Sequence, residues 1–74
     1  MRYEPTMRTT NPAALIGRAM PGQHVTYVDE CGYEIRGQVD HVAHEGDPEF
    51  EHIVIAWAFA DLGKIGQFQT AFYH

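Results

Sequence analysis

Three histidines and five carboxylic acids lie within thirteen consecutive residues. The histidines are His41, His44 and His52. The acids are Asp40, Glu45, Asp47, Glu49 and Glu51. Zinc accepts imidazole and carboxylate ligands in tetrahedral geometry, but side chains at odd spacing along a strand point to opposite faces unless a bulge intervenes. The segment therefore predicts a solvated acidic loop without a metal, and the alternatives are a zinc site or a pH sensor built from the three histidines.

The single cysteine, Cys31, is a second candidate for chemistry, as a nucleophile. Its base would be His24 or His41, and Asp29 would supply the acid. The carboxylates of Asp29 and Glu30 disfavour the thiolate that this chemistry needs. The sequence holds no Gly-x-Ser-x-Gly, P-loop, His-Glu-x-x-His or Cys-x-x-Cys motif. We therefore expect a non-catalytic protein without a cofactor.

The distribution of charge argues against nucleic acids as direct partners. The chain has ten acidic side chains against five of Lys or Arg, which gives a formal net charge of −5. Residues 21–74 hold nine of the acids and only two basic side chains, Arg36 and Lys64. Such a surface repels phosphate backbones instead of releasing their counterions. Direct nucleic-acid binding is therefore not expected, whereas a basic protein partner would suit the charge.

The length and the single cysteine narrow the class of protein. A chain of 74 residues forms one domain near the lower limit for a stable core. One cysteine cannot form a disulfide within the chain, and we find neither a signal peptide nor an apolar run of about 18 residues. We expect a cytoplasmic protein that does not enter a membrane.

The first twenty residues predict an arm and a helix. Residues 1–10 lack an apolar period and predict a flexible arm, followed by a single β-rich domain over residues 11–74. Asn11 fits a helix N-cap and Pro12 fits the first helical position. A short helix is therefore expected over residues 12–20, ending at Pro21 and Gly22.

Four strands are expected after the helix. Alternating β-formers predict a hairpin with strands over residues 23–29 and 33–42. Residues 44–51 predict an exposed loop because they are polar and include Gly46 and Pro48. The apolar run over residues 53–60 predicts a strand covered on both faces, and the last strand spans residues 65–73. One small domain has too little material to cover both strands on both faces, so we expect a homo-oligomer or a bound partner.

The second strand contains a displaced apolar residue. Val42 follows Val39 by three positions, so strict alternation would turn it outward. A bulge near Asp40 and His41 would return it to the core. Gly37 offers another bending point, and strands that bend in mid-course favour a curled sheet.

The glycines and valines of this hairpin resemble a known pattern. The block Gly22-x-x-Val25-x-Tyr27, Gly32, Gly37-x-Val39-x-x-Val42 resembles the opening hairpin of SH3-like barrels of the Tudor and KOW kind. The resemblance implies a mainly β fold, a small SH3-like curled sheet or barrel of four to five antiparallel strands with a short N-terminal helix.

The same resemblance implies a binding mode. Tudor-like barrels hold methylated lysine or arginine in an aromatic cage, through cation–π contacts. The rings that could form such a cage here are Tyr27, Tyr33, Phe50 and Trp57. The alternative is that these aromatics are core residues and hairpin pairs.

Together these features predict a small acidic protein-interaction module. A narrower form of this prediction is an accessory or phage-type inhibitor that binds or blocks a partner protein. The residues expected to contact the partner are Asp40, Glu45, Asp47, Glu49, Glu51, Tyr27, Tyr33 and Trp57. The alternative is a homo-oligomeric small-molecule-binding protein or enzyme with a pocket at subunit junctions. Its lining residues would be Trp57, Phe59, Gln67 and Gln69.

Overall fold

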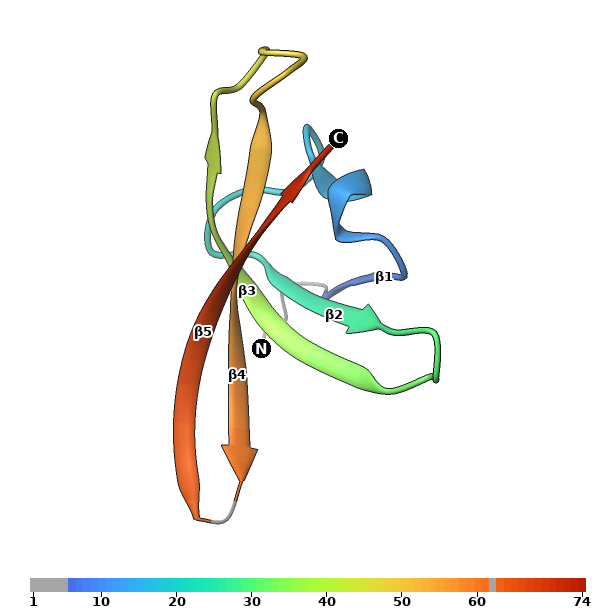
Figure 1. The fold of residues 1–74 in the computed structure, drawn as a ribbon, viewed down its shortest axis with the longest axis vertical. Helices are drawn as coiled ribbons and strands as arrows, with labels where there is room; N and C mark the ends of the chain where they lie inside the picture. The colour runs from blue at the N-terminus through green and yellow to red at the C-terminus, as the bar shows by residue number, and fades with distance from the viewer. Residues whose placement is uncertain (1–5, 62) are drawn as a thin grey trace, which may run out of the picture.

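One mixed β-sheet makes up most of the computed structural model, which describes residues 6–61 and 63–74 (Figure 1). Its elements are β1 (Met7–Thr9), the 3-10 turn η1 (Pro12–Leu15), β2 (His24–Val28), β3 (Glu34–Ala43), β4 (His52–Asp61) and β5 (Lys64–Tyr73). The strands lie side by side in this order. β1 runs parallel to β2, and the other neighbouring strands are antiparallel. The prediction of a mainly β fold is confirmed.

The sheet is not closed into a barrel, which corrects the expected SH3-like closure. A barrel closes only when the two edge strands of its sheet pair with each other. Here β1 lies at one edge and β5 at the other, and in the described residues these two do not pair. β1 is also only three residues long and parallel to its neighbour. The chain therefore forms an open sheet of five strands.

The expected helix is reduced to the 3-10 turn η1. Its start is as predicted, since Oδ1 of Asn11 accepts a hydrogen bond from the backbone N–H of Ala13 at 3.3 Å and Pro12 takes the first position. The turn ends early because Ile16 has an extended ψ of 128° and Gly17 a φ of +80°, a left-handed conformation that stops a helix. No helical segment among the described residues has the length and apolar content needed to span a membrane.

Part of the expected N-terminal arm belongs to the sheet. Residues Met7–Thr9 form β1, where Nη2 of Arg8 donates a hydrogen bond to Oε2 of Glu34 at 3.0 Å. This exposed ion pair lowers the pKa of Glu34, first through the hydrogen bond and then through the charge of Arg8. Residues 1–5 lie outside the described part, so the division into an arm and a domain stays a prediction.

The bulge expected in the second strand is confirmed. The register of β3 against β4 shifts between Val39 and His41. Val39 pairs with Ile55, and after the shift Val42 pairs with Ile53. Because side chains alternate along a strand, the extra residue places both valines on the same face.

The hydrophobic core lies between that face and the segment around η1. The buried core residues are Leu15, Ile16, Ala19, Val25, Val39, Ile53, Ile55 and Trp57. Met20, which follows this segment, is 72% exposed. On the opposite face of the sheet, Val54 of β4 is buried, but Ala58 of the same strand is exposed. The prediction that β4 is covered on both faces therefore fails at this residue.

Gly37 gives the indole ring of Trp57 the space that it occupies in the core. The two residues pair across β3 and β4. A Cβ atom at residue 37 would lie 2.6 Å from the backbone oxygen of Ala56 and 2.6 Å from Cε3 of Trp57. Both distances are shorter than van der Waals contact, so only glycine fits at this position.

We expect Gly37→Ala to lower the free energy of unfolding by about 1–3 kcal/mol, as overpacking of a tight core does. The measurement is urea denaturation followed by tryptophan fluorescence. The control is Arg36→Ala, an exposed position on β3, which should change stability by less than about 0.5 kcal/mol. Equal denaturation midpoints for Gly37→Ala and the wild type would contradict this packing.

Candidate functional site

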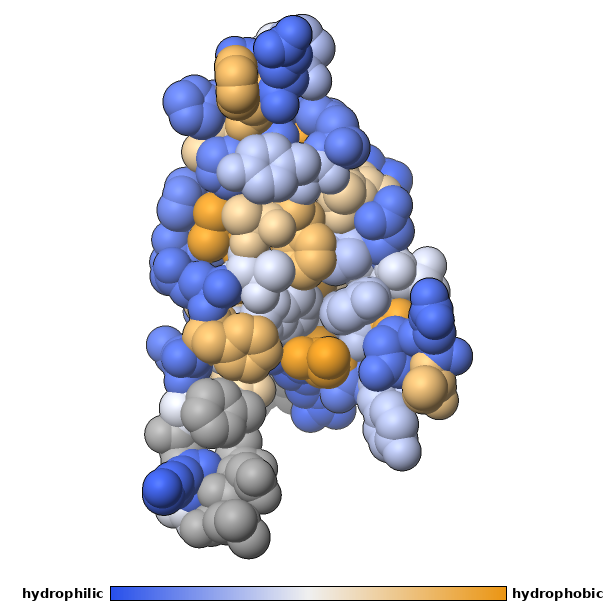
Figure 2. All heavy atoms as spheres, in the orientation of Figure 1, coloured by the Kyte–Doolittle hydropathy of each residue, from blue (hydrophilic) through white to orange (hydrophobic). Residues whose placement is uncertain are grey.

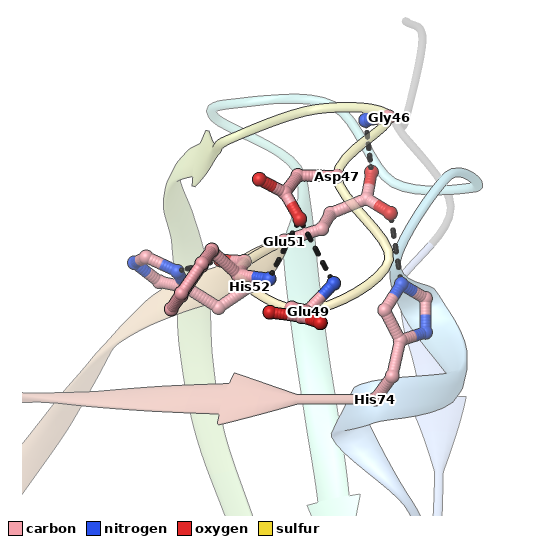
Figure 3. A network of polar contacts seen from close by, with 7 residues as sticks. Gly46, Asp47, Glu49, Glu51, His52 and His74 are labelled. Atoms are coloured by element: carbon pink, nitrogen blue, oxygen red, sulfur yellow. Dashed lines mark hydrogen bonds and ion pairs between the residues drawn. The ribbon is translucent and has the colours of Figure 1, made fainter.

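The acidic loop, residues 44–51, is a folded turn that joins β3 to β4 (Figure 3). Oδ1 of Asp47 accepts hydrogen bonds from the backbone N–H groups of Glu49 at 2.9 Å and Phe50 at 3.2 Å. The backbone N–H of Asp47 donates to the carbonyl oxygen of His44 at 3.0 Å. His44 and Gly46 both have positive φ angles, 53° and 82°, which reverse the chain direction. The predicted loop therefore has a defined shape.

Glu51 ties the acidic loop to the residue that follows β5. Its side chain is only 15% exposed. Oε1 accepts a hydrogen bond from Nε2 of His74 at 2.8 Å, and Oε2 accepts one from the backbone N–H of Gly46 at 3.3 Å. These bonds stabilise the ionised carboxylate and lower the pKa of Glu51, with His74 as the larger cause. No sequence pattern predicts this contact, because residues 51 and 74 are far apart along the chain.

The carboxylates of the acidic loop have two roles. Those of Asp47 and Glu51 bond within the protein and hold the loop in shape. Those of Glu45 and Glu49 are exposed, and neither forms a hydrogen bond or ion pair with the described residues. Two of the four predicted contact residues in the loop are therefore available to a partner.

A small hollow lies beside the acidic loop, and we call it the acidic hollow. It has a volume of about 270 Å³ and is lined by Gly17, Ala19, Met20, Pro21, Val42, Glu45 and Glu51. Apolar side chains and two carboxylates thus share one concave surface. In the acidic loop, Phe50 is 57% exposed. The sequence predicted the acidic side of this hollow and missed Met20.

Asp40, at the bulge, pairs with its neighbour instead of with the acidic loop. Its Oδ2 accepts a hydrogen bond from Nδ1 of His41 at 2.6 Å, and both side chains are about half exposed. The bulge leaves these two polar residues on the surface while Val39 and Val42 face the core.

The histidines do not form one cluster. The rings of His44 and His52 lie 5.9 Å apart between centroids, and His52 lies 4.6 Å from the ring of Tyr73. His41 is held by Asp40. Within residues 6–61 and 63–74, no group of three His, Cys, Asp or Glu side chains is placed to hold a metal ion.

The four rings of the expected aromatic cage lie in different surroundings. Trp57 is only 2% exposed and packs in the core, with its ring 6.1 Å from that of Tyr27. Tyr33 is exposed beside the turn between β2 and β3, and Phe50 lies in the acidic loop, 6.3 Å from the ring of His44. Trp57 and Tyr27 lie together on the core face of the sheet, whereas Tyr33 and Phe50 lie in two separate turns, so the structure does not bring the four rings together.

The side chains expected to line a pocket at subunit junctions also lie apart from one another. Trp57 pairs with Phe68 and faces the core, whereas Gln67 and Gln69 flank Phe68 along β5. By alternation the two glutamines lie on the opposite face of the sheet. The side chain of Phe59 lies outside the described residues. Within one chain, the described members of this set line no common pocket.

Cys31 is exposed in the turn after β2 and makes no catalytic arrangement with His24. Its backbone N–H donates to Oδ1 of Asp29 at 2.9 Å, so this aspartate shapes the turn. His24 is the first residue of β2, and Cys31 comes after the last. The length of the strand, about 13 Å, therefore lies between the two residues.

Comparisons of this chain with protein-family models, curated proteins and solved structures find no match. The candidate site therefore rests on its own residues and geometry, and the acidic hollow with its loop is the best-defined part.

The bonds to Glu51 predict a dependence of stability on pH. Because its pKa is lower in the folded state, the ionised carboxylate stabilises the fold above its unfolded pKa, and this stabilisation is lost as the pH falls through the folded pKa. We expect carbon NMR titration to give Glu51 a pKa below its ordinary value of 4.5. His74→Ala should move that pKa back upward, because His74 is the larger cause. His24→Ala, at an exposed position on β2, is the control, and an equal pKa in all three proteins would contradict the contact.

Proposed function

We propose that this protein is a small non-catalytic interaction module that binds a basic partner protein through the acidic loop and the acidic hollow. The partner segment that fits combines a Lys or Arg side chain with an apolar one. An accessory protein or phage-type inhibitor that covers a basic surface of its target would use the same contacts.

The acidic hollow is the observation that carries this proposal. Its lining combines the apolar side chains of Ala19, Met20 and Val42 with the carboxylates of Glu45 and Glu51. An apolar side chain of the partner would bury Met20, which is exposed in the single chain. A neighbouring Lys or Arg would meet Glu45, whose carboxylate has no partner among the described residues.

The charge of the loop supports the choice of a basic partner. Residues 44–51 contain four acidic side chains and no Lys or Arg. Charge complementarity of this kind raises the association rate and selects against acidic partners. Because Asp47 and Glu51 hold the loop in shape, binding would cost little ordering of the backbone.

The test is an NMR titration of the labelled protein with a short synthetic peptide of alternating Lys and Leu. We expect the largest shift changes in residues 44–51 and at Met20, and a loss of affinity at high salt. Glu45→Gln and Glu49→Gln should each weaken binding by about 2–5-fold, as loss of a surface charge pair does.

The matched control is Glu30→Gln, which removes one exposed carboxylate from the turn between β2 and β3. It changes net charge by the same amount and should leave the affinity within about twofold of the wild type. An equal effect of all three substitutions would show that only net charge matters, and binding that is unchanged at 0.5 M salt (about a 4 Å screening length) would refute the acidic contact.

A further inference from the structure

The outer edge of β5 is long and unprotected. β5 pairs with β4 over ten residue pairs, from Lys64 to Tyr73, and in the described part of the chain no strand lies on its other side. About half of the backbone N–H and C=O groups of such a strand point away from its neighbour. Proteins block exposed edges of this kind with charges, prolines or short strands. From residue 65 to residue 73 the chain has neither a charged residue nor a proline.

The opposite edge of the same sheet is protected. β1 has only three residues, and its middle residue, Arg8, is charged and paired with Glu34. Among the described residues this edge offers little backbone for pairing, and the ion pair ties it across β2 to β3. Of the two edges, only β5 is suited to receive a further strand.

An apolar hollow on the core face adjoins β5. It has a volume of about 220 Å³ and is lined by Tyr27, Ile35, Trp57, Phe68, Thr70 and Phe72. Half of these residues belong to β5, and Phe68 is 49% exposed. Figure 2 shows apolar and weakly polar side chains in the middle of the face that it presents, with hydrophilic side chains along the margins and both kinds at the upper tip. The outer edge of β5 therefore adjoins an apolar surface.

The accessible surface is larger than that of a compact monomer. The chain exposes 5626 Å², whereas about 4,600 Å² is expected for a folded monomer of 8.4 kDa. The radius of gyration of 12.9 Å also exceeds the roughly 11 Å expected at this length. An open sheet of this kind exposes more surface than a compact monomer, and pairing with a second copy would bury part of that surface.

The distribution of charge allows a second copy of the chain to bind along β5. Two chains of net charge −5 repel each other, but no residue lining the apolar hollow is charged. The acidic loop lies at the other end of the β4–β5 hairpin from the turn that joins these strands (Figure 1). Two copies can therefore meet along β5 without bringing their acidic loops face to face.

From these observations we propose that the protein forms a twofold-symmetric dimer in which β5 pairs antiparallel with β5 of a second copy. The two sheets join into one sheet of ten strands, and the apolar hollows of the two copies extend across the symmetry axis. The interface is isologous, so each copy contributes the same strand and the same side chains.

The experiment uses two variants of opposite charge. Gln67 and Gln69 are exposed on the outer face of β5, near the middle of the strand, where a twofold axis places them beside their copies. Gln67→Lys with Gln69→Lys would oppose like charges across the interface, and so would Gln67→Glu with Gln69→Glu. In sedimentation equilibrium we expect a dimer for the wild type and a dissociation constant raised about tenfold or more in each variant. An equimolar mixture of the two variants should recover dimer formation.

The control is Thr6→Lys with His24→Lys, two exposed positions at the β1 end of the sheet. It adds the same charge as the lysine variant and should leave the dissociation constant close to that of the wild type. Circular dichroism verifies the fold of each variant, and hydrogen exchange should show the β5 amides that point away from β4 protected only where the dimer forms. A monomeric wild type, unchanged association of both charged variants, or a mixture that does not recover would each overturn the proposal.

Discussion

One extra residue in β3 determines which side chains of the sheet face the core. The register shift between Val39 and His41 allows Val39 to pair with Ile55 and Val42 with Ile53. Without it, the residues of β3 beyond Asp40 would turn to the other face, because side chains alternate with a period of two. The core, the polar surface at Asp40 and His41, and the place where the acidic loop begins all depend on this shift.

The molecule separates its charged surface from its apolar one. At one end of the β3–β4 hairpin, the acidic loop presents Glu45 and Glu49 beside the acidic hollow. On the core face of β4 and β5, the apolar hollow is free of charged residues. A basic partner and a second copy of the chain would therefore use different surfaces, and binding of one need not displace the other.

Local patterns predicted the strands, the acidic loop and the bulge, because each depends on neighbouring residues. Val39 and Val42 are three residues apart, and this spacing requires an extra residue if both are buried. The helix prediction failed at Gly17, whose left-handed conformation ends the turn. Barrel closure failed because it depends on which distant edges pair, and no local pattern reports that β1 adds in parallel to β2.

The sequence by itself determined the alternation of the strands, the position of the bulge and the acidic character of residues 44–51, since these follow from residue type and spacing. Only the tertiary structure decided that Trp57 is buried over Gly37 and that the four rings of the expected aromatic cage do not come together. It also decided that His74 holds Glu51 and that β5 keeps an open edge. These features arise from contacts between residues distant in sequence, and packing, not local preference, selects those contacts.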